Sequence, residues 1–104
     1  MIRTVRFLAI LVLLMLAGAD KPSRHAVTIG ESGFSPASVQ IRAGDTVVWT
    51  NTDDRDHAVQ SGDGSFKTGN IRPGKSVSLT FSKPGTYTYG CPYHPRERGT
   101  VVVE

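Results

Sequence analysis

Residues 85–95 read Gly-Thr-Tyr-Thr-Tyr-Gly-Cys-Pro-Tyr-His-Pro, and this stretch joins the pattern of a β-strand to two side chains that can bind a metal. Tyr87 and Tyr89 lie two residues apart, so in a strand both side chains point to the same face. Continuing that alternation turns Cys91 to this face as well. The stretch therefore predicts a strand that carries a thiol to the end of the core, where water is scarce.

Short segments of strand character follow one another along the chain, separated by turn residues such as Gly44-Asp45 and Pro84-Gly85. No segment has a convincing helical period. We expect strands at residues 25–29, 38–41, 46–51, 58–60, 76–81, 85–90 and 100–103. Many short strands with turns at this spacing predict an all-β fold, a β-sandwich of about seven to eight strands.

The apolar alternation indicates which face of each strand is buried. In four of the expected strands, apolar or aromatic residues lie two apart and therefore share a face. These residues are Val47 and Trp49, Val77, Leu79 and Phe81, Tyr87 and Tyr89, and Val101 and Val103. Phe34, Phe66 and Ile71 lie in connecting stretches and are expected to close the ends of the sandwich. We assign all of them to the core and none to a cofactor.

The N-terminal segment has the pattern of a secretory signal peptide. Arg3 and Arg6 precede an apolar run at 7–16, and Ala-Gly-Ala at 17–19 supplies a cleavage site. The apolar run is shorter than the roughly 20 residues that a membrane-spanning helix needs. We predict that residues 1–19 are removed and that residues 20–104 form one domain. This predicts an exported protein, with the bacterial periplasm as its expected location and no membrane anchor after cleavage.

The charge and the cysteine count narrow the possible functions. The whole chain has a net charge of +3, but without Arg3 and Arg6 it has ten basic and nine acidic residues. This near balance gives no reason to expect nucleic-acid binding. Cys91 is the only cysteine, so it forms no internal disulfide. In an oxidising compartment a lone thiol is reactive unless a metal occupies it, although a buried inert cysteine is the alternative.

A metal site is indicated by Cys91 and His94 on one short loop together with His57 upstream. One thiolate and two imidazoles form the His₂Cys ligand set of copper sites that transfer electrons. The soft thiolate donates charge to the metal, and imidazole binds either oxidation state of copper. The residues therefore predict a mononuclear Cu(I)/Cu(II) site and electron transfer as the leading function.

Six motifs together point to one known family. They are AGDTVVW at 43–49, DHAV at 56–59, RPG at 72–74, PGTY at 84–87, CPYHP at 91–95 and GTVVVE at 99–104. With them the chain resembles the small type 1 copper proteins of the cupredoxin superfamily, nearest to amicyanin, with plastocyanin and pseudoazurin more distant. The resemblance implies a Greek-key β-sandwich that holds one copper ion, with His57, Cys91 and His94 as equatorial ligands.

The resemblance also implies how the protein meets its partners. The ring edge of His94 would reach the surface and pass the electron to a redox protein that docks there, with Tyr93 and Pro95 in the docking patch. Arg96 adds positive charge and indicates an acidic partner, unless it is an ordinary solvated arginine. We expect a monomer.

One position departs from the family pattern. Amicyanin-like loops read Cys-x-x-His-x-x-Met with a weak axial thioether, whereas this chain has Glu97 there and no Met in residues 20–104. Three interpretations stay open. Glu97 binds copper axially, or it turns outward to pair with Arg96 or Arg98, or the Cys-His-His-Glu set holds zinc in a closed tetrahedron.

Acidic residues precede His57, the first of the three candidate ligands in the sequence. Asp53, Asp54 and Asp56 lie just before His57 with Arg55 among them. Such runs are typical of solvated turns, so we assign them no ligand role. For Asp56 the alternative to a solvated turn is that its side chain positions His57.

Three classes of function follow from these residues. The preferred one is an exported carrier of single electrons between redox partners. A copper-binding protein for storage, delivery or resistance is the alternative, because the usual axial ligand is missing. We do not expect an enzyme, since Cys91 and His94 are co-ligands and the sequence contains no evident acid-base constellation.

Overall fold

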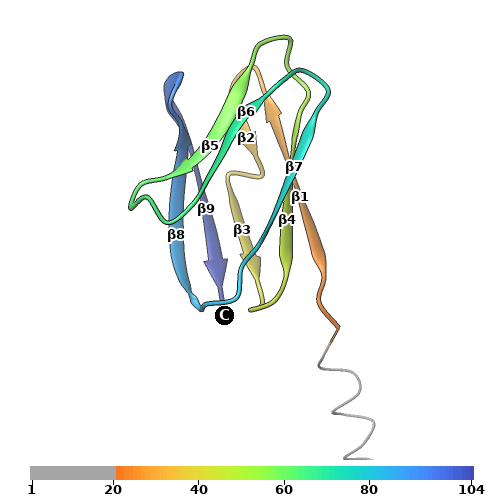
Figure 1. Ribbon diagram of the computed structural model, residues 1–104, viewed down its shortest axis with the longest axis vertical. Coiled ribbons are helices and arrows are strands. Elements are labelled where there is room, and N and C mark those ends of the chain that lie inside the picture. The colour runs from red at the N-terminus through yellow and green to blue at the C-terminus, as the bar shows by residue number, and fades with distance from the viewer. Residues whose placement is uncertain (1–20) are drawn as a thin grey trace, which may run out of the picture.

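The computed structural model describes residues 21–104, which form two β-sheets packed face to face (Figure 1). The strands are β1 (Arg24–Gly30), β2 (Gly33–Ser35), β3 (Ser38–Ile41), β4 (Thr46–Asn51), β5 (His57–Ser61), β6 (Lys67–Ile71), β7 (Ser76–Thr80), β8 (Gly85–Cys91) and β9 (His94–Val103). The expected signal segment, residues 1–19, lies outside the described residues. Within residues 21–104, the structure contains no helix long and apolar enough to cross a membrane.

The chain crosses several times between the two sheets. One sheet has the order β2-β1-β4-β7 and the other β3-β9-β8-β5-β6. β1 runs parallel to β4, and β3 runs parallel to β9, whereas the other pairs are antiparallel. The predicted all-β sandwich is confirmed, and every expected strand is present.

Two strands beyond the expected seven complete the nine strands of the described region. β2 has only three residues, too few for an alternating pattern, and it is recognised by its antiparallel pairing with β1. β6 reads Lys-Thr-Gly-Asn-Ile, which has no aromatic residue and contains Gly and Asn, two residues that strands disfavour. Pairing with β5 makes it a strand at the edge of the five-stranded sheet.

The core between the sheets is centred on Trp49. In β4 burial alternates strictly, and Val47 and Trp49 are completely buried. The Trp49 ring lies edge-on to Tyr89, with ring centroids 5.4 Å apart. All the predicted core residues belong to this cluster, fully or partly buried, and Phe34, Phe66 and Ile71 join it as expected. Each large side chain buried here contributes about 1.5–3 kcal/mol of transfer free energy.

The sheets bring the residues predicted to bind the metal together at one end of the sandwich. β8 and β9 form a hairpin in which Cys91 pairs with His94 across a bulge after Gly90. β5 pairs with β8 and starts at His57. The last strand was expected to start at Thr100, but β9 already begins at His94. The segment with Cys91 and His94 is therefore the tip of a hairpin and not a long connection.

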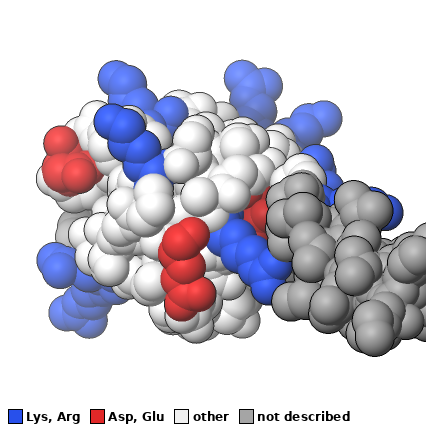
Figure 2. Space-filling model, turned by 90° about the horizontal axis from the view of Figure 1, so that it is seen from below, with Lys and Arg blue, Asp and Glu red and all other residues white. Residues whose placement is uncertain are grey.

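Figure 2 shows the opposite end of the sandwich, where Lys and Arg side chains lie scattered around the rim among neutral and acidic residues. They form no single continuous patch on this face. The view agrees with the near balance of charge in the sequence.

The close packing of Tyr89 over Gly99 allows a test of the core. Gly99 lies opposite Tyr89 in the β8–β9 register, and the Tyr89 ring occupies the space that a side chain at this position would need. A Cβ on Gly99 would overlap both Cζ and Oη of Tyr89. Van der Waals repulsion in such an overlap forces the ring or the strand to move.

We therefore expect Gly99→Ala to lower the free energy of unfolding by about 1–3 kcal/mol, measured by denaturant titration of the metal-free protein. Gly30→Ala is the matched control, because a Cβ there meets its nearest heavy atom only at 4.0 Å. Equal stability of the two variants would contradict the packing of Tyr89 over Gly99.

Asp45 ties the turn before β4 to the segment that starts β1. Its carboxylate accepts hydrogen bonds from the backbone amides of Ser23 (2.8 Å) and Arg42 (3.0 Å), and His25 Nε2 lies 3.0 Å from Oδ2. These contacts lower the pKa of Asp45 from 3.8 to about 2. The hydrogen bond from the Ser23 amide has the largest effect, followed by those from His25 and the Arg42 amide.

A carboxyl group whose pKa is lowered by folding stabilises the fold above its unfolded pKa and loses that contribution as the pH falls toward its folded pKa. We expect the metal-free protein to lose stability as the pH falls from 3.8 to about 2, and Asp45→Asn to lose less over this range. Denaturant titrations at several pH values measure both. An identical loss in both proteins would show that Asp45 does not contribute to the acid sensitivity.

Candidate metal centre

Cys91 and His94 face each other across the tip of the β8–β9 hairpin. Cys91 Sγ lies 3.5 Å from His94 Nδ1. The Cys91 side chain ends the inward-facing row of β8, as its alternation predicted, and the residue is only 3% exposed. The hairpin therefore presents sulfur on the core side and imidazole on the solvent side of one small space.

His57 enters this space from the neighbouring strand. It is the first residue of β5 and is completely buried. Its ring lies 4.7 Å from that of His94, centroid to centroid. One residue from β5 and two from the hairpin are thus brought together by the pairing of β5 with β8, although they are separated widely in sequence.

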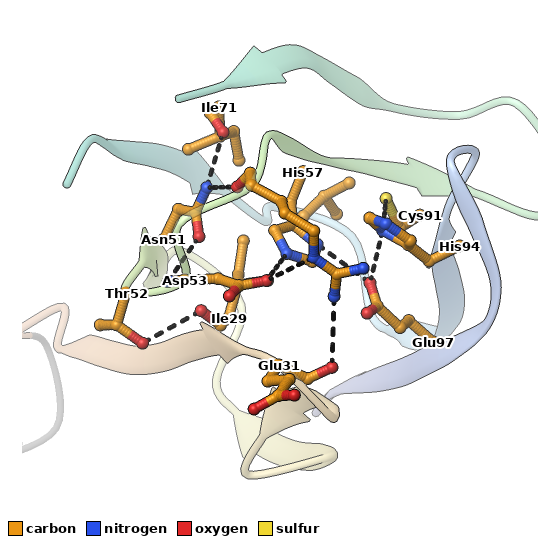
Figure 3. A network of polar contacts seen from close by, with 12 residues as sticks. Ile29, Glu31, Asn51, Thr52, Asp53, His57, Ile71, Cys91, His94 and Glu97 are labelled. Atoms are coloured by element: carbon orange, nitrogen blue, oxygen red, sulfur yellow. Dashed lines mark hydrogen bonds and ion pairs between the residues drawn. The ribbon is translucent and has the colours of Figure 1, made fainter. Parts of the chain in front are cut away.

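Glu97 also points into the same space (Figure 3). Its Oε1 lies 3.0 Å from His57 Nδ1 and 3.3 Å from His94 Nδ1, and the residue is 8% exposed. The interpretation in which Glu97 turns outward toward Arg96 or Arg98 does not describe this structure. The carboxylate instead faces both imidazoles, as the interpretations with a metal ligand at this position require.

Asp53 supports His57 from behind. Asp53 Oδ2 lies 2.8 Å from His57 Nε2 and accepts a hydrogen bond from Arg55 Nε at 3.2 Å (Figure 3). The pKa of Asp53 lies well below its ordinary value, chiefly because of the hydrogen bond from His57, while burial opposes this shift. An ionised carboxylate only accepts, so Nε2 carries the proton and Nδ1 is the nitrogen that faces Cys91, His94 and Glu97.

The sequence interpretation missed Asp53. The prediction of a solvated turn is right for Asp54 and Asp56, which are exposed, and wrong for Asp53, whose carboxylate is mostly buried. Asp56 does not position His57, because it accepts a hydrogen bond from Asn70 instead. The only signal for Asp53 was its place four residues before a candidate ligand, which is too common to single it out.

Asn51 holds the loop that carries Asp53. This fully buried residue donates from Nδ2 to the carbonyl groups of Arg55 (2.7 Å) and Ile71 (2.9 Å). Its Oδ1 accepts from the backbone amide of Asp53 at 2.9 Å. Three hydrogen bonds from one side chain therefore fix the connection between β4 and β5 on the core side.

One edge of the site is open to solvent. The His94 side chain is 24% exposed, and the neighbouring Tyr93 is 54% exposed, the only large apolar side chain in residues 21–104 to be so. A cleft of about 460 Å³ lies beside them, with Arg55, Arg96 and Glu97 in its wall. His57 and Cys91 are buried, so His94 is the ligand candidate nearest to an approaching molecule.

The four side chains are suited to hold a metal ion. The Cys91 sulfur, one nitrogen each of His57 and His94, and a Glu97 oxygen all lie within 4.8 Å of one another. A soft sulfur and two imidazole nitrogens suit copper or zinc, whereas magnesium or calcium would call for oxygen ligands. The donor set therefore fits the copper that the sequence predicted.

Comparison with known proteins identifies the family. The model of the cupredoxin-like domain matches residues 4–103, and the chain belongs to this family. Amicyanin-alpha of Methylorubrum extorquens is 41% identical over 83 residues, which are 75% of this chain and 70% of that protein. Cupredoxins of this kind bind one copper ion, and this chain gathers a Cys-His-His-Glu cluster whose donors suit copper.

Solved structures agree with this assignment. A purple cupredoxin from Nitrosopumilus maritimus superposes with a TM-score of 0.72 at 29% identity, covering 77% of this chain and 99% of that one. A copper-containing nitrite reductase from Thermus scotoductus superposes with a TM-score of 0.74 at 29% identity. The match covers 81% of this chain but only 23% of the reductase, so it is a likeness to one part of a much longer enzyme.

The contact between Asp53 and His57 leads to a prediction about metal affinity. Asp53→Asn keeps the size of the side chain but removes the charge behind the His57 ring. We expect the dissociation constant for Cu(II) to rise about 10- to 100-fold, as is usual when the partner of a ligand histidine is removed. Competition with a chelator of known affinity measures the change.

Asp54→Asn is the matched control, because Asp54 is adjacent, equally charged and exposed. It should leave the affinity unchanged. If both variants bind copper as tightly as the wild type, the hydrogen bond from His57 to Asp53 does not support the site.

Proposed function

We propose that the protein is an exported copper protein that carries single electrons between redox partners. Its proposed ligands are His57, Cys91 and His94, with Glu97 as the fourth. The observation that carries this proposal is the cluster itself, in which a buried thiol and a buried imidazole meet a second imidazole whose edge reaches solvent. Copper bound there would supply one-electron chemistry through its two oxidation states.

The ligands are held by parts of the fold that resist movement. Cys91 and His94 are paired across the β8–β9 hairpin, and His57 is fixed by Asp53 and by the pairing of β5 with β8. Buried side chains in a close-packed core have little freedom to rearrange. Such a site changes little between oxidation states, which favours fast electron transfer over slow capture and release of metal.

The exposed edge of His94 is the proposed exit for the electron. Tyr93 adds an apolar surface beside it, and Arg96 and Arg55 place positive charge around the same cleft. An apolar centre with a charged rim is the usual composition of a docking patch. A redox protein with an acidic rim fits this surface, because complementary charge speeds the encounter.

Glu97 distinguishes this site from those of its relatives with an axial methionine. A hard anionic oxygen stabilises Cu(II) more than Cu(I), and its charge adds to that of the thiolate. The potential should therefore be lower than that of a thioether site. Zinc in a closed Cys-His-His-Glu set is the competing possibility, but copper is bound more tightly than zinc by most ligand sets of this kind.

A copper-handling role is the second candidate function. The observation that favours it is the contact of Glu97 with both imidazoles, because a carboxylate that locks Cu(II) in place suits storage or delivery. Catalysis is less well supported. The similarity to nitrite reductase covers a fraction of that enzyme, and the chain belongs with small electron-transfer cupredoxins such as amicyanin.

Replacement of Glu97 tests its role at the metal. In Glu97→Gln and Glu97→Met we expect the reduction potential to rise by more than about 59 mV, which is a tenfold change in the relative affinity for the two oxidation states. The visible absorption should shift toward that of an ordinary blue site. Voltammetry and absorption of the copper-loaded variants measure these effects.

Glu31→Gln is the control for charge alone. Glu31 is exposed and lines the same cleft, but it does not belong to the four candidate ligands. Its variant should change the potential far less. If Glu97→Gln behaves like Glu31→Gln, the carboxylate of Glu97 is not a ligand.

Reversible voltammetry of the wild type separates the two candidate functions. A carrier should give a fast, reversible one-electron wave with no loss of copper over repeated cycles. Loss of copper on reduction, or a wave that is slow and irreversible, would favour copper handling.

A further inference from the structure

Two side chains donate to the same oxygen of Asp53. Oδ2 accepts from His57 Nε2 at 2.8 Å (Figure 3) and from Arg55 Nε at 3.2 Å. The other oxygen, Oδ1, accepts from the backbone amide of Asp54 at 2.9 Å. His57 and Arg55 therefore compete for the electron density of a single carboxylate oxygen.

Other contacts than the one with Arg55 also hold the Asp53 carboxylate in place. The backbone amide of Asp53 donates to Asn51 Oδ1 at 2.9 Å, and the Asp54 amide fixes Oδ1. The Asp53 side chain is only 8% exposed, so the surrounding fold encloses it. We therefore expect Arg55 to change how strongly Oδ2 accepts, more than where it lies.

Arg55 connects this pair of contacts to the surface. Its side chain is 49% exposed and lines the cleft of about 460 Å³ beside Tyr93 and His94. Nη2 lies 3.5 Å from the Glu31 carbonyl oxygen, so the side chain spans from Asp53 to the β1–β2 turn. A guanidinium carries five N–H groups, and those outside these two contacts have no hydrogen-bond partner among residues 21–104. They are free to bind an acidic group in the cleft.

The positive charge of Arg55 weakens the hydrogen bond between His57 and Asp53. A cation at Oδ2 draws electron density from the oxygen that accepts the Nε2 proton, and it lowers the negative potential that this proton meets. A carboxylate behind a ligand histidine makes the imidazole a more basic ligand. Arg55 therefore opposes the effect of Asp53 on the His57 ring.

We propose that Arg55 acts on His57 through Asp53, and that an acidic group bound in the cleft relieves this action by compensating the guanidinium charge. In this way the charge in the cleft reaches the metal centre. The part that concerns copper and a redox partner rests on the proposed function. The effect on the hydrogen bond of His57 belongs to the metal-free protein and is tested there.

The direct test is the nuclear magnetic resonance signal of the proton on His57 Nε2 in metal-free Arg55→Gln. A stronger hydrogen bond moves a proton signal downfield, so we expect this signal downfield of its wild-type position. Arg96→Gln is the matched control, because Arg96 is exposed and lines the same cleft, whereas the contact with Asp53 belongs to Arg55. It removes the same charge from the cleft and should leave the signal in place.

A purely structural role of Arg55 gives the opposite result. If Arg55 only holds Asp53, its loss loosens the contact, and the His57 signal moves upfield or is lost by exchange with water. Either result, or an unchanged signal, would overturn the proposal. The wild type offers an independent check, since the Nε proton of Arg55 should exchange with water more slowly than that of Arg96. Equal exchange rates would contradict the contact with Asp53.

Hexaglutamate added to the metal-free protein at low ionic strength tests the link to the cleft. It should move the His57 Nε2 signal downfield in the wild type and in Arg96→Gln, but not in Arg55→Gln. The backbone signals of residues 93–96 report whether the peptide binds. Binding that leaves the His57 signal unmoved, or a lack of binding, would show that acidic groups in the cleft do not act on His57.

The copper-loaded variants separate this proposal from the proposed function. Arg55→Gln should lower the reduction potential more than Arg96→Gln does, because a more basic His57 stabilises Cu(II). Equal potentials in the two variants would contradict the route through Asp53. If the protein forms no thiolate-to-copper band, the proposed function fails, whereas the proton signals of the metal-free protein still decide whether Arg55 acts on His57.

Discussion

The complete burial of His57 is the constraint on which the metal end of the molecule depends. A buried imidazole needs a partner for each ring nitrogen, because an unsatisfied polar atom in the core costs about 1–3 kcal/mol. Asp53 meets Nε2 at 2.8 Å and Glu97 faces Nδ1 at 3.0 Å. The two carboxylates come from distant parts of the sequence, so satisfying one ring requires the β4–β5 loop and the β8–β9 hairpin to close on each other.

The remaining features of the site follow from this closure. Asn51 fixes the loop that supplies Asp53, and the pairing of β5 with β8 brings Cys91 alongside His57. The core around Trp49 and Tyr89 supports the hairpin from below. Only His94 is left with an edge in solvent, so the same packing that rigidifies the ligands also decides where a partner can approach.

Local patterns in the sequence accounted for seven of the nine described strands and for three of the candidate ligands, because alternation and the Cys-x-x-His spacing are short-range signals. β6 was missed since its sequence has little strand preference, and it forms through pairing with β5. Asp53 was missed because a carboxylate in an acidic turn gives no sign of burial. The orientation of Glu97 stayed open because it depends on the buried ring of His57, which is distant in sequence and close only in the fold.

Titration of the metal-free protein with Cu(II), followed by visible absorption and electron paramagnetic resonance, tests the central claim most directly. The account predicts an intense thiolate-to-copper band that saturates at one copper per chain and is absent in Cys91→Ser. A protein that binds copper without any thiolate band would contradict it, because Cys91 would then lie outside the metal centre.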